Sequence, residues 1–340
     1  MALTVYGAGA IGGVTGAALA RAGHDVLLVD ADADHVAAMN TSGLTIDSPG
    51  GGWTARVRAV APDRLGSGLG LVLLAVKSQH TAEALDVLAF RLARDGAIVS
   101  LQNGLNEELI ADRVGPERTI GCLVNWAADW TAPGRIQHGG TGAFVVGELD
   151  GASSPRVKDV AALLEAVTDT RVTDNILGYK WAKHVYAALL TATAVVDAHV
   201  FEVVERSPAI QRMLVALVAE GMTVADGLDV RLEAFDEFDP TWYWEAAAGD
   251  DDAVARCMTA IARHYRAHTK TKTGIWRDLA VRKRKTEVAA HFGTTLAKAD
   301  RLGLAMPLTR RLGEVIGELE TGRRRMAWEN LDELVVLSPI

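Results

Sequence analysis

The stretch VYGAGAIGG, residues 5–13, decides the fold of the first half of this chain. It carries the pattern Gly7-x-Gly9-x-x-Gly12, follows the apolar run at residues 3–7, and opens segment 13–23, which predicts a helix ending at Gly23. Glycines at these positions permit a tight turn, close approach of the backbone to a pyrophosphate, and close packing of helix on strand. The pattern alone is weak, but a preceding strand and a following helix are the context that a dinucleotide-binding loop requires.

Short apolar runs alternate with segments of helical pattern through the rest of the first half. The runs at 25–30, 71–77, 97–103 and 142–149 predict strands. Such alternation is typical of a parallel sheet with crossover helices, so we predict an α/β Rossmann-type domain over residues 1–170. The loop residues expected to contact a bound dinucleotide are Gly7, Ala8, Gly9, Ala10, Ile11 and Gly12.

The second half has long Ala-, Leu- and Val-rich segments and few strand signals. Segment 181–196 is apolar nearly all round, which is typical of a buried helix. The stretch at 236–252, with aromatic residues, a proline and a run of acids, is interpreted as a loop between helices. Because the pattern breaks at 168–175, we place the domain boundary there and expect an all-α domain over residues 171–340.

Composition and charge argue against several classes of protein. Acidic residues outnumber basic ones by 43 to 35, which disfavours a protein that mainly coats nucleic acid or anionic lipid. Cys122 and Cys257 have neither metal-ligand nor disulfide spacing, so a reduced, cytoplasmic setting is expected. The apolar run at 185–196 is too short to cross a bilayer, and no membrane segment is expected. No His, Cys and carboxylate cluster has metal-ligand spacing, so no metal is expected.

Asp30 closes the predicted second strand, 18 residues after Gly12. A carboxylate there accepts hydrogen bonds from the hydroxyls of the adenosine ribose and repels a 2′-phosphate. Asp32 and Asp34 follow, and no Arg or Lys lies between Asp30 and Arg56. These residues favour NAD over NADP as the cofactor, and the alternative is an acid that is simply solvated at a strand end.

Five motifs keep a characteristic order and approximate spacing along nearly the whole chain. They are YGAGAIGG (6–13), AVKSQHT (75–81), LQNGLNEE (101–108), NILGYKWAKHVY (175–186) and RKTEVAAHFG (284–293). Together they resemble the ketopantoate reductase family. The resemblance implies a Rossmann domain followed by a helical domain like that of 6-phosphogluconate dehydrogenase. It also implies an active site in the cleft between the domains, and reduction of 2-keto acids with a nicotinamide cofactor.

The resemblance also implies catalytic roles for Lys183 and Glu287. The family's general acid is a lysine in a Trp-x-Lys setting on the first long helix of the second domain, which Trp181-Ala-Lys183 matches. An ammonium group that is desolvated in an apolar helix gives up its proton more readily. Lys180 is the competing candidate but falls outside the matched position. Glu287 matches the family's Arg-x-Thr-Glu pattern and is expected to orient Lys183 or a cofactor hydroxyl, with a surface ion pair as the alternative.

Three further cofactor positions follow from the resemblance. Asn103 and Gly104 follow a predicted strand, where ligands bind in an open parallel sheet, and the family's Asn-Gly contacts the cofactor near the nicotinamide ribose. Lys77 matches a lysine that the family keeps near the cofactor, and Ala127 matches a backbone contact. The alternatives are a turn-forming asparagine and a solvated lysine. His138 is interpreted as structural.

The chain departs from the ketopantoate-specific pattern at the positions that bind substrate. That pattern has asparagines four and eight residues after the lysine and a serine twelve residues before the glutamate, where this chain has Ala187, Thr191 and Ile275. Loss of these donors would leave the carboxylate and hydroxyl of the old substrate unpaired, which discriminates heavily against it. We therefore predict a bulkier or more apolar 2-keto acid or ketone, with the aromatic residues at 242–244 able to line or cover its pocket.

The leading hypothesis is an NAD-linked reductase of a 2-keto acid, in which Lys183 protonates the carbonyl oxygen. An NAD-dependent D-2-hydroxyacid dehydrogenase and an imine- or opine-type reductase are alternatives, and the latter needs no proton donor to oxygen. A third alternative is a regulator that binds nicotinamide nucleotides without turnover. The presence of both Lys183 and Glu287 argues against it. A small molecule is the expected partner. The sequence leaves open whether the helical half forms the interface of a homodimer.

The basic run VRKRKTEVAAHF, residues 281–292, suggests nucleic acid at first sight. Placed on a helix, Lys283 and Arg284 share a face with Glu287, while Val288 and Phe292 mark the buried stripe. Most of the basic side chains would then face solvent, and one or two of them could attract an anionic substrate or the cofactor phosphates. The acidic pI of 5.6 and the lack of a recognised motif argue against nucleic acid.

Overall fold

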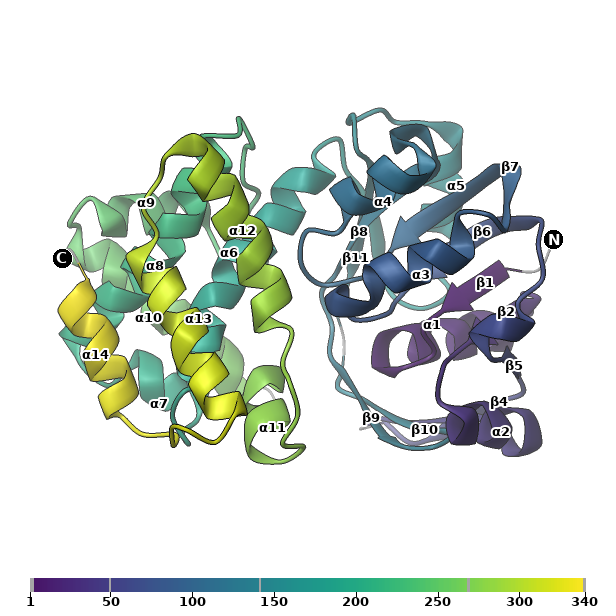
Figure 1. The fold of residues 1–340 in the computed structure, drawn as a ribbon, viewed down its shortest axis with the longest axis horizontal. Helices are drawn as coiled ribbons and strands as arrows, with labels where there is room; N and C mark the ends of the chain where they lie inside the picture. The colour runs from purple at the N-terminus through teal and green to yellow at the C-terminus, as the bar shows by residue number, and fades with distance from the viewer. Residues whose placement is uncertain (1–2, 49, 141, 268–269, 339–340) are drawn as a thin grey trace. The chain divides into compact units, whose positions relative to one another are not determined.

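A computed structural model describes residues 3–48, 50–140, 142–267 and 270–338, and the chain divides into two compact units, Met1–Lys180 and Trp181–Ile340 (Figure 1). The division falls within helix α6 (Ile176–Thr193), a few residues closer to the C-terminus than the boundary predicted at 168–175. That break contains the short strand β12 (Thr170–Val172), which pairs with the main sheet, and the first turn of α6 also packs on the first unit.

The first unit is built on an eight-stranded sheet in the order β12-β11-β8-β7-β6-β1-β2-β5. Its other strands are β1 (Leu3–Tyr6), β2 (Val26–Val29), β5 (Arg58–Val60), β6 (Leu69–Leu74), β7 (Leu92–Ser100), β8 (Thr119–Val124) and β11 (Phe144–Glu148). The run from β5 to β8 is parallel throughout, and β11 is antiparallel to β8. The predicted α/β domain is therefore confirmed. The chain leaves β1 towards β2 and returns to β6 on its other side, which makes the β1–β6 boundary the topological switch point.

Side chains on each strand alternate between two helical layers, because successive residues of a strand point to opposite faces. Val5, Leu73 and Val99 belong to the core formed with α1 (Ala10–Arg21) and α5 (Pro155–Leu164). Tyr6, Leu74 and Ile98 belong to the core formed with α3 (Thr81–Leu88) and α4 (Glu107–Val114), which lie on the near face in Figure 1. Both faces of the parallel strands are covered, which explains why these strands are continuous apolar runs.

A second, four-stranded sheet packs against α1 and was not predicted. Its order is β4-β3-β10-β9, with bounds β3 (Leu44–Asp47), β4 (Trp53–Ala55), β9 (Ala128–Ala132) and β10 (Arg135–His138). Contact with α1 is close, since a Cβ on Gly13 would lie 2.3 Å from Ile136 Cδ1. Helix α2 (Ala33–Ser42) precedes β3, and its N-cap is Asp32, whose side chain accepts a hydrogen bond from the His35 N–H.

Every regular element in the described part of the second unit is a helix, apart from an isolated β-bridge between Phe235 and Phe238, which confirms the predicted all-α domain. After α6 it contains α7 (Val200–Val204), α8 (Pro208–Asp226), α9 (Pro240–Ala247), α10 (Asp251–Ala267), α11 (Gly274–Ala280), α12 (Val288–Leu302), α13 (Pro307–Glu320) and α14 (Glu329–Leu337). Helix α8 is central and contacts α7, α9, α10, α12, α13 and α14. A search of the described helices finds none with the length and apolar character that crossing a membrane requires.

Two local predictions in this unit were wrong. Segment 236–252 contains α9 and the start of α10, because Asp239 caps the helix through the Thr241 N–H, Pro240 suits its first position, and Tyr243 supplies a buried face. The basic run is not helical before Val288, because α11 ends at Ala280 and the chain then turns.

The turn between α11 and α12 is held by ion pairs of its own. Asp278 is buried and accepts from Arg282 at 3.3 Å and from Arg284 at 3.0 Å, while Lys283 adopts a φ of 48°. A residue with this backbone conformation cannot continue a helix. The expected common face of Lys283, Arg284 and Glu287 therefore does not form.

Lys180, at the start of α6, makes a buried ion pair with Glu107 of α4. The two charged groups are 2.8 Å apart, with only 3% and 2% of their side chains exposed. Lys180 Nζ also donates to the Gln102 carbonyl at 2.5 Å and to the Cys122 carbonyl at 3.5 Å. The three acceptors account for the three N–H donors of an ammonium group, so this lysine ties α6 to α4 and to the ends of two strands.

Replacing Lys180 with Met should destabilise the protein strongly, because Glu107 would keep a buried charge without its partner. We expect the free energy of unfolding to fall by about 3–5 kcal/mol, measured by urea denaturation. The double variant Lys180→Met/Glu107→Leu should recover much of this loss. As a control, Arg58→Met removes one partner of the exposed Arg58–Asp25 pair and should cost less than about 1 kcal/mol. Equal losses of stability in Lys180→Met and Arg58→Met would contradict the assignment of Lys180–Glu107 as a buried structural ion pair.

Candidate active site

The three glycines of the loop after β1 are required for different reasons. Gly7 has a φ of 97°, and a Cβ there would lie 2.7 Å from the Val76 nitrogen. A Cβ on Gly12 would lie 2.0 Å from the Gly7 oxygen, so α1 could not pack so close to the loop with any larger residue. Around Gly9, by contrast, a Cβ would meet no atom within 4 Å, which leaves open space beside the loop.

The other predicted cofactor residues follow the carboxyl ends of neighbouring strands. Asp30 follows β2, Lys77 follows β6, Asn103 follows β7 and Ala127 follows β8. Since the sheet order is β8-β7-β6-β1-β2 and these strands are parallel, these ends lie along one edge of the sheet, on both sides of the glycine loop. This edge at the switch point is where open α/β sheets bind ligands.

Hydrogen bonds join the loops that carry Lys77 and Asn103. The Asn103 carbonyl accepts from Ser78 Oγ at 2.8 Å and from Asn106 Nδ2 at 2.7 Å. Gln102 Nε2 donates to the Val76 carbonyl at 2.9 Å. The backbone of Asn103 is thus fixed while its side chain is exposed, and Lys77 is half-buried. An exposed amide on a fixed backbone is suited to contact a ligand.

Asp30 is half-buried at the end of β2, and its Oδ1 accepts from the Asp32 N–H at 3.0 Å. No basic side chain in the described part of the chain pairs with it. Its other carboxylate oxygen has no donor among the described residues, so it can accept hydrogen bonds from a ribose. The open space at Gly9 and this acid are together compatible with a dinucleotide that lacks a 2′-phosphate.

The segment after β8 is a packing segment as well as a candidate contact. The Ala127 carbonyl accepts from the Gly139 N–H at 2.7 Å. Trp126 is 9% exposed and meets His138 edge to face at 5.2 Å between ring centroids. Burial lowers the pKa of His138, which favours the neutral ring. This packing agrees with a structural role for His138.

In the helical unit, Lys183, Ala187 and Thr191 are four residues apart on α6 and therefore share one face. Thr191 is buried, and its hydroxyl donates to the Ala187 carbonyl of the same helix at 2.8 Å. Ile275 lies in the first turn of α11, which the Thr273 side chain caps. Ala187 and Ile275 have no side-chain donor for a ligand, and the hydroxyl proton of Thr191 is used within the helix.

His184 joins the turn of α6 that carries Lys183 to α12. Its Nε2 is 2.5 Å from Thr295 Oγ1, and its ring meets the His291 ring at 5.8 Å and the Trp181 ring at 5.9 Å. His291 lies one turn after Glu287, which is half-buried at the N-cap of α12. His184, next to Lys183, therefore contacts α12 at Thr295 and at His291.

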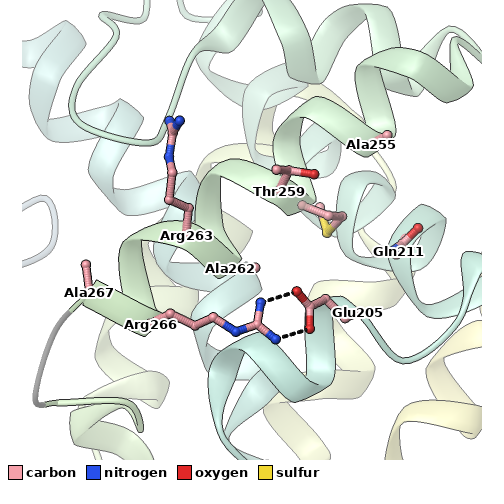
Figure 2. Close-up of a pocket in the computed structure, with 9 residues that line it drawn as sticks. Glu205, Gln211, Ala255, Thr259, Ala262, Arg263, Arg266 and Ala267 are labelled. Atoms are coloured by element: carbon pink, nitrogen blue, oxygen red, sulfur yellow. Dashed lines mark hydrogen bonds and ion pairs between the residues drawn. The ribbon is translucent and has the colours of Figure 1, made fainter.

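Two surface hollows of this unit lie elsewhere. One, of about 570 Å³, is bordered by α7, α8 and α10, and Figure 2 shows Arg266 and Glu205 hydrogen-bonded at its edge. A second lies beside it and is lined in part by Trp242. Trp242 is one of the aromatic residues expected to line the substrate pocket, whereas the first hollow contains no residue predicted for the site. Tyr243 is fully buried and belongs to the core, so it lines neither hollow.

Sequence spacing also missed a group of possible metal ligands. Asp236, Glu237 and His264 have ligand atoms within 4.8 Å of one another. Glu237 already accepts from Tyr186 at 2.6 Å and pairs with His264 Nδ1 at 2.9 Å. Burial raises the pKa of Glu237, but the hydrogen bonds from His264 and Tyr186 outweigh burial and lower it, while Glu237 raises the pKa of His264. These contacts describe an internal ion pair that holds α6 to α10.

The fold and the loop geometry define a class: two-domain proteins in which a Rossmann-type dinucleotide-binding domain precedes a helical domain. Comparison with known families narrows this class. Residues 3–151 match the family described as "Ketopantoate reductase PanE/ApbA", and residues 175–320 match "Ketopantoate reductase PanE/ApbA C terminal". The chain belongs to the ketopantoate reductase family.

Individual relatives agree with this assignment. A 2-dehydropantoate 2-reductase of Pyrococcus abyssi is 31% identical over 70% of this chain and 79% of its own length. The crystal structure of 2-dehydropantoate 2-reductase from Geobacter metallireducens is 25% identical, with a TM-score of 0.78 over 94% of this chain and 99% of that one. A D-mandelate dehydrogenase bound to NADH and anilino(oxo)acetate is 22% identical, with a TM-score of 0.80 over 95% and 99% of the two chains, and shares the fold.

Proposed function

We propose that this chain is a nicotinamide-dependent oxidoreductase that reduces the carbonyl group of a 2-keto acid, or oxidises the matching 2-hydroxy acid. The observation that carries the proposal is the glycine loop at the switch point, with Asp30, Lys77, Asn103 and Ala127 on the neighbouring strand ends. Membership of the ketopantoate reductase family through both halves of the chain supports the reaction class.

Each candidate residue has a distinct role in this proposal. The glycine loop would hold the pyrophosphate through backbone N–H groups, and Asp30 would accept hydrogen bonds from the adenosine ribose. The chemistry that a bound reduced nicotinamide supplies is a hydride for the carbonyl carbon. Lys183 Nζ would give a proton to the carbonyl oxygen, and Glu287 would orient that ammonium group or a cofactor hydroxyl.

The substrate is proposed to be a 2-keto acid with a larger or more apolar side chain than ketopantoate. Ala187 and Ile275 have no side-chain donors, and the Thr191 hydroxyl donates within its own helix. Such positions bind apolar groups and leave extra hydroxyls unpaired. The structural neighbour that is a D-mandelate dehydrogenase is compatible with this class of substrate.

Replacing Lys183 with Ala should abolish most turnover, because the developing alkoxide would lose its proton donor. We expect kcat to fall by about 10²–10⁴-fold in an assay of NADH oxidation across a panel of 2-keto acids. Lys285→Ala is the matched control, since it removes an exposed lysine from the neighbouring turn, and it should leave kcat unchanged. Full activity of Lys183→Ala on 2-keto acids would disprove the role of Lys183 as the proton donor.

The wild-type protein should prefer NADH to NADPH, because the Asp30 carboxylate repels a 2′-phosphate. Asp30→Asn should reduce kcat/KM for NADH by about 10–100-fold, because a charged acceptor is lost. It should also reduce the preference for NADH over NADPH. The control Asp34→Asn changes an exposed acid in the first turn of α2 and should have little effect. A strong preference of the wild type for NADPH would overturn the assignment of NAD.

Ketopantoate should be a poor substrate, and 2-keto acids with branched or aromatic side chains should be better ones. The double variant Ala187→Asn/Ile275→Ser restores two donors of the ketopantoate-specific pattern, so it should raise kcat/KM for ketopantoate by about tenfold or more. As a control, Ala297→Asn changes an exposed residue of α12 and should leave kcat/KM for ketopantoate unchanged. Efficient reduction of ketopantoate by the wild type would contradict this reading of the pocket.

A further inference from the structure

His35 is a buried histidine that the sequence motifs do not include. It lies in the first turn of α2 with 1% of its surface exposed. Its Nε2 is 2.9 Å from the carbonyl oxygen of Ala8, in the middle of the glycine loop. Its backbone N–H is also bound, by the Asp32 side chain that caps α2. The imidazole therefore joins the loop to the helix that follows the predicted ribose-binding acid.

The other ring nitrogen fixes the protonation state. Nδ1 accepts from the Gly134 N–H at 2.9 Å and lies 3.3 Å from Trp130 Nε1, which is a donor only. Two donors aimed at Nδ1 require its lone pair, so the proton of the neutral ring is on Nε2. His35 thus donates to Ala8, and the β9–β10 hairpin selects the tautomer that can do so.

The direction of the Ala8 carbonyl sets the direction of the next N–H group. In a planar trans peptide the C=O of Ala8 and the N–H of Gly9 point in opposite directions. Because the Ala8 oxygen points to His35, the Gly9 N–H points away from it. That N–H has no hydrogen-bond partner among the described residues, whereas those of Gly7 and Ala8 donate to the Val29 carbonyl.

We infer that His35 is a positioning residue for the cofactor, and this inference rests on the proposed function. By donating to Ala8 it holds the Ala8–Gly9 peptide in the orientation that presents the Gly9 N–H to the pyrophosphate of a dinucleotide. Without this donor the peptide can rotate and turn its carbonyl oxygen towards the anion, which repels it. The β9–β10 hairpin becomes part of cofactor binding through Trp130 and Gly134, although it is remote from the loop in sequence.

The test measures binding of phosphate-containing and phosphate-free ligands to His35→Leu. NADH affinity is measured by its fluorescence, and ADP and adenosine are measured by displacement of NADH or by NMR titration. We expect the Kd of NADH and ADP to rise by about tenfold, the effect of losing one well-placed hydrogen bond, with adenosine unchanged. Equal weakening of all three ligands would overturn the inference in favour of a general loss of structure, and unchanged affinities would overturn it too.

Two further variants separate ordering of the loop from folding. His35→Gln retains a side-chain donor and acceptor and should recover NADH affinity to within about threefold of the wild type. Trp130→Phe removes one donor to Nδ1 and should shift the ¹⁵N NMR signals of His35 away from the pure Nε2–H tautomer. Failure of His35→Gln to rescue binding while its melting temperature is normal would contradict the donor role.

These outcomes are distinguishable from failure of the proposed function. If the wild type binds neither NADH nor ADP, the cofactor site itself is wrong. If the wild type binds both but reduces no 2-keto acid, the proposed reaction fails and the His35 experiment can still be decided. If binding and reduction are both normal in His35→Leu, the positioning role alone is wrong.

Discussion

The position that a Cβ on Gly12 would take lies 2.0 Å from the Gly7 carbonyl oxygen, and this close approach is the constraint on which the first unit depends. A side chain larger than hydrogen would push α1 away from β1. The helix would then lose its contact with Val5 in the main sheet and with Ile136 in the smaller one. Close packing of this helix also brings its unpaired N–H groups to the switch point, so the same contact serves both folding and the proposed binding of phosphates.

The two lysines of α6 show how surroundings separate a structural charge from a candidate catalytic one. Lys180 is enclosed, and its ammonium group has three acceptors in Glu107, Gln102 and Cys122. An ammonium whose donors are all engaged in a buried ion pair has no proton to offer a substrate. Lys183 is one turn further on, half-buried, on the face shared with Ala187 and Thr191. The sequence match chose Lys183, and the burial of Lys180 gives an independent physical reason to reject the competitor.

Prediction from sequence worked where one local signal was enough. The strands of the parallel sheet were recognisable because burial on both faces makes each a continuous apolar run. The glycine loop was recognisable because the spacing of its glycines follows from backbone geometry, whereas the role of Asp30 stays a prediction. Prediction failed where a short-range pattern had two solutions. The aromatic and acidic stretch at 236–252 looked like a loop but contains α9, whose cap at Asp239 and buried Tyr243 outweigh its polar flanks. The basic run looked helical but is turned by Lys283 and held by the buried Asp278.

By itself the sequence determined the class of fold, the dinucleotide loop and the family, because each depends on residues that are close in the chain or on motifs in a fixed order. Only the tertiary structure decided which polar groups meet. The contact of His35 with Ala8 spans 27 residues, its contact with Gly134 spans 99, and Lys180 reaches Gln102 across 78. No periodicity links such positions, since hydrogen bonds between them form only after the sheet and its helices have been packed.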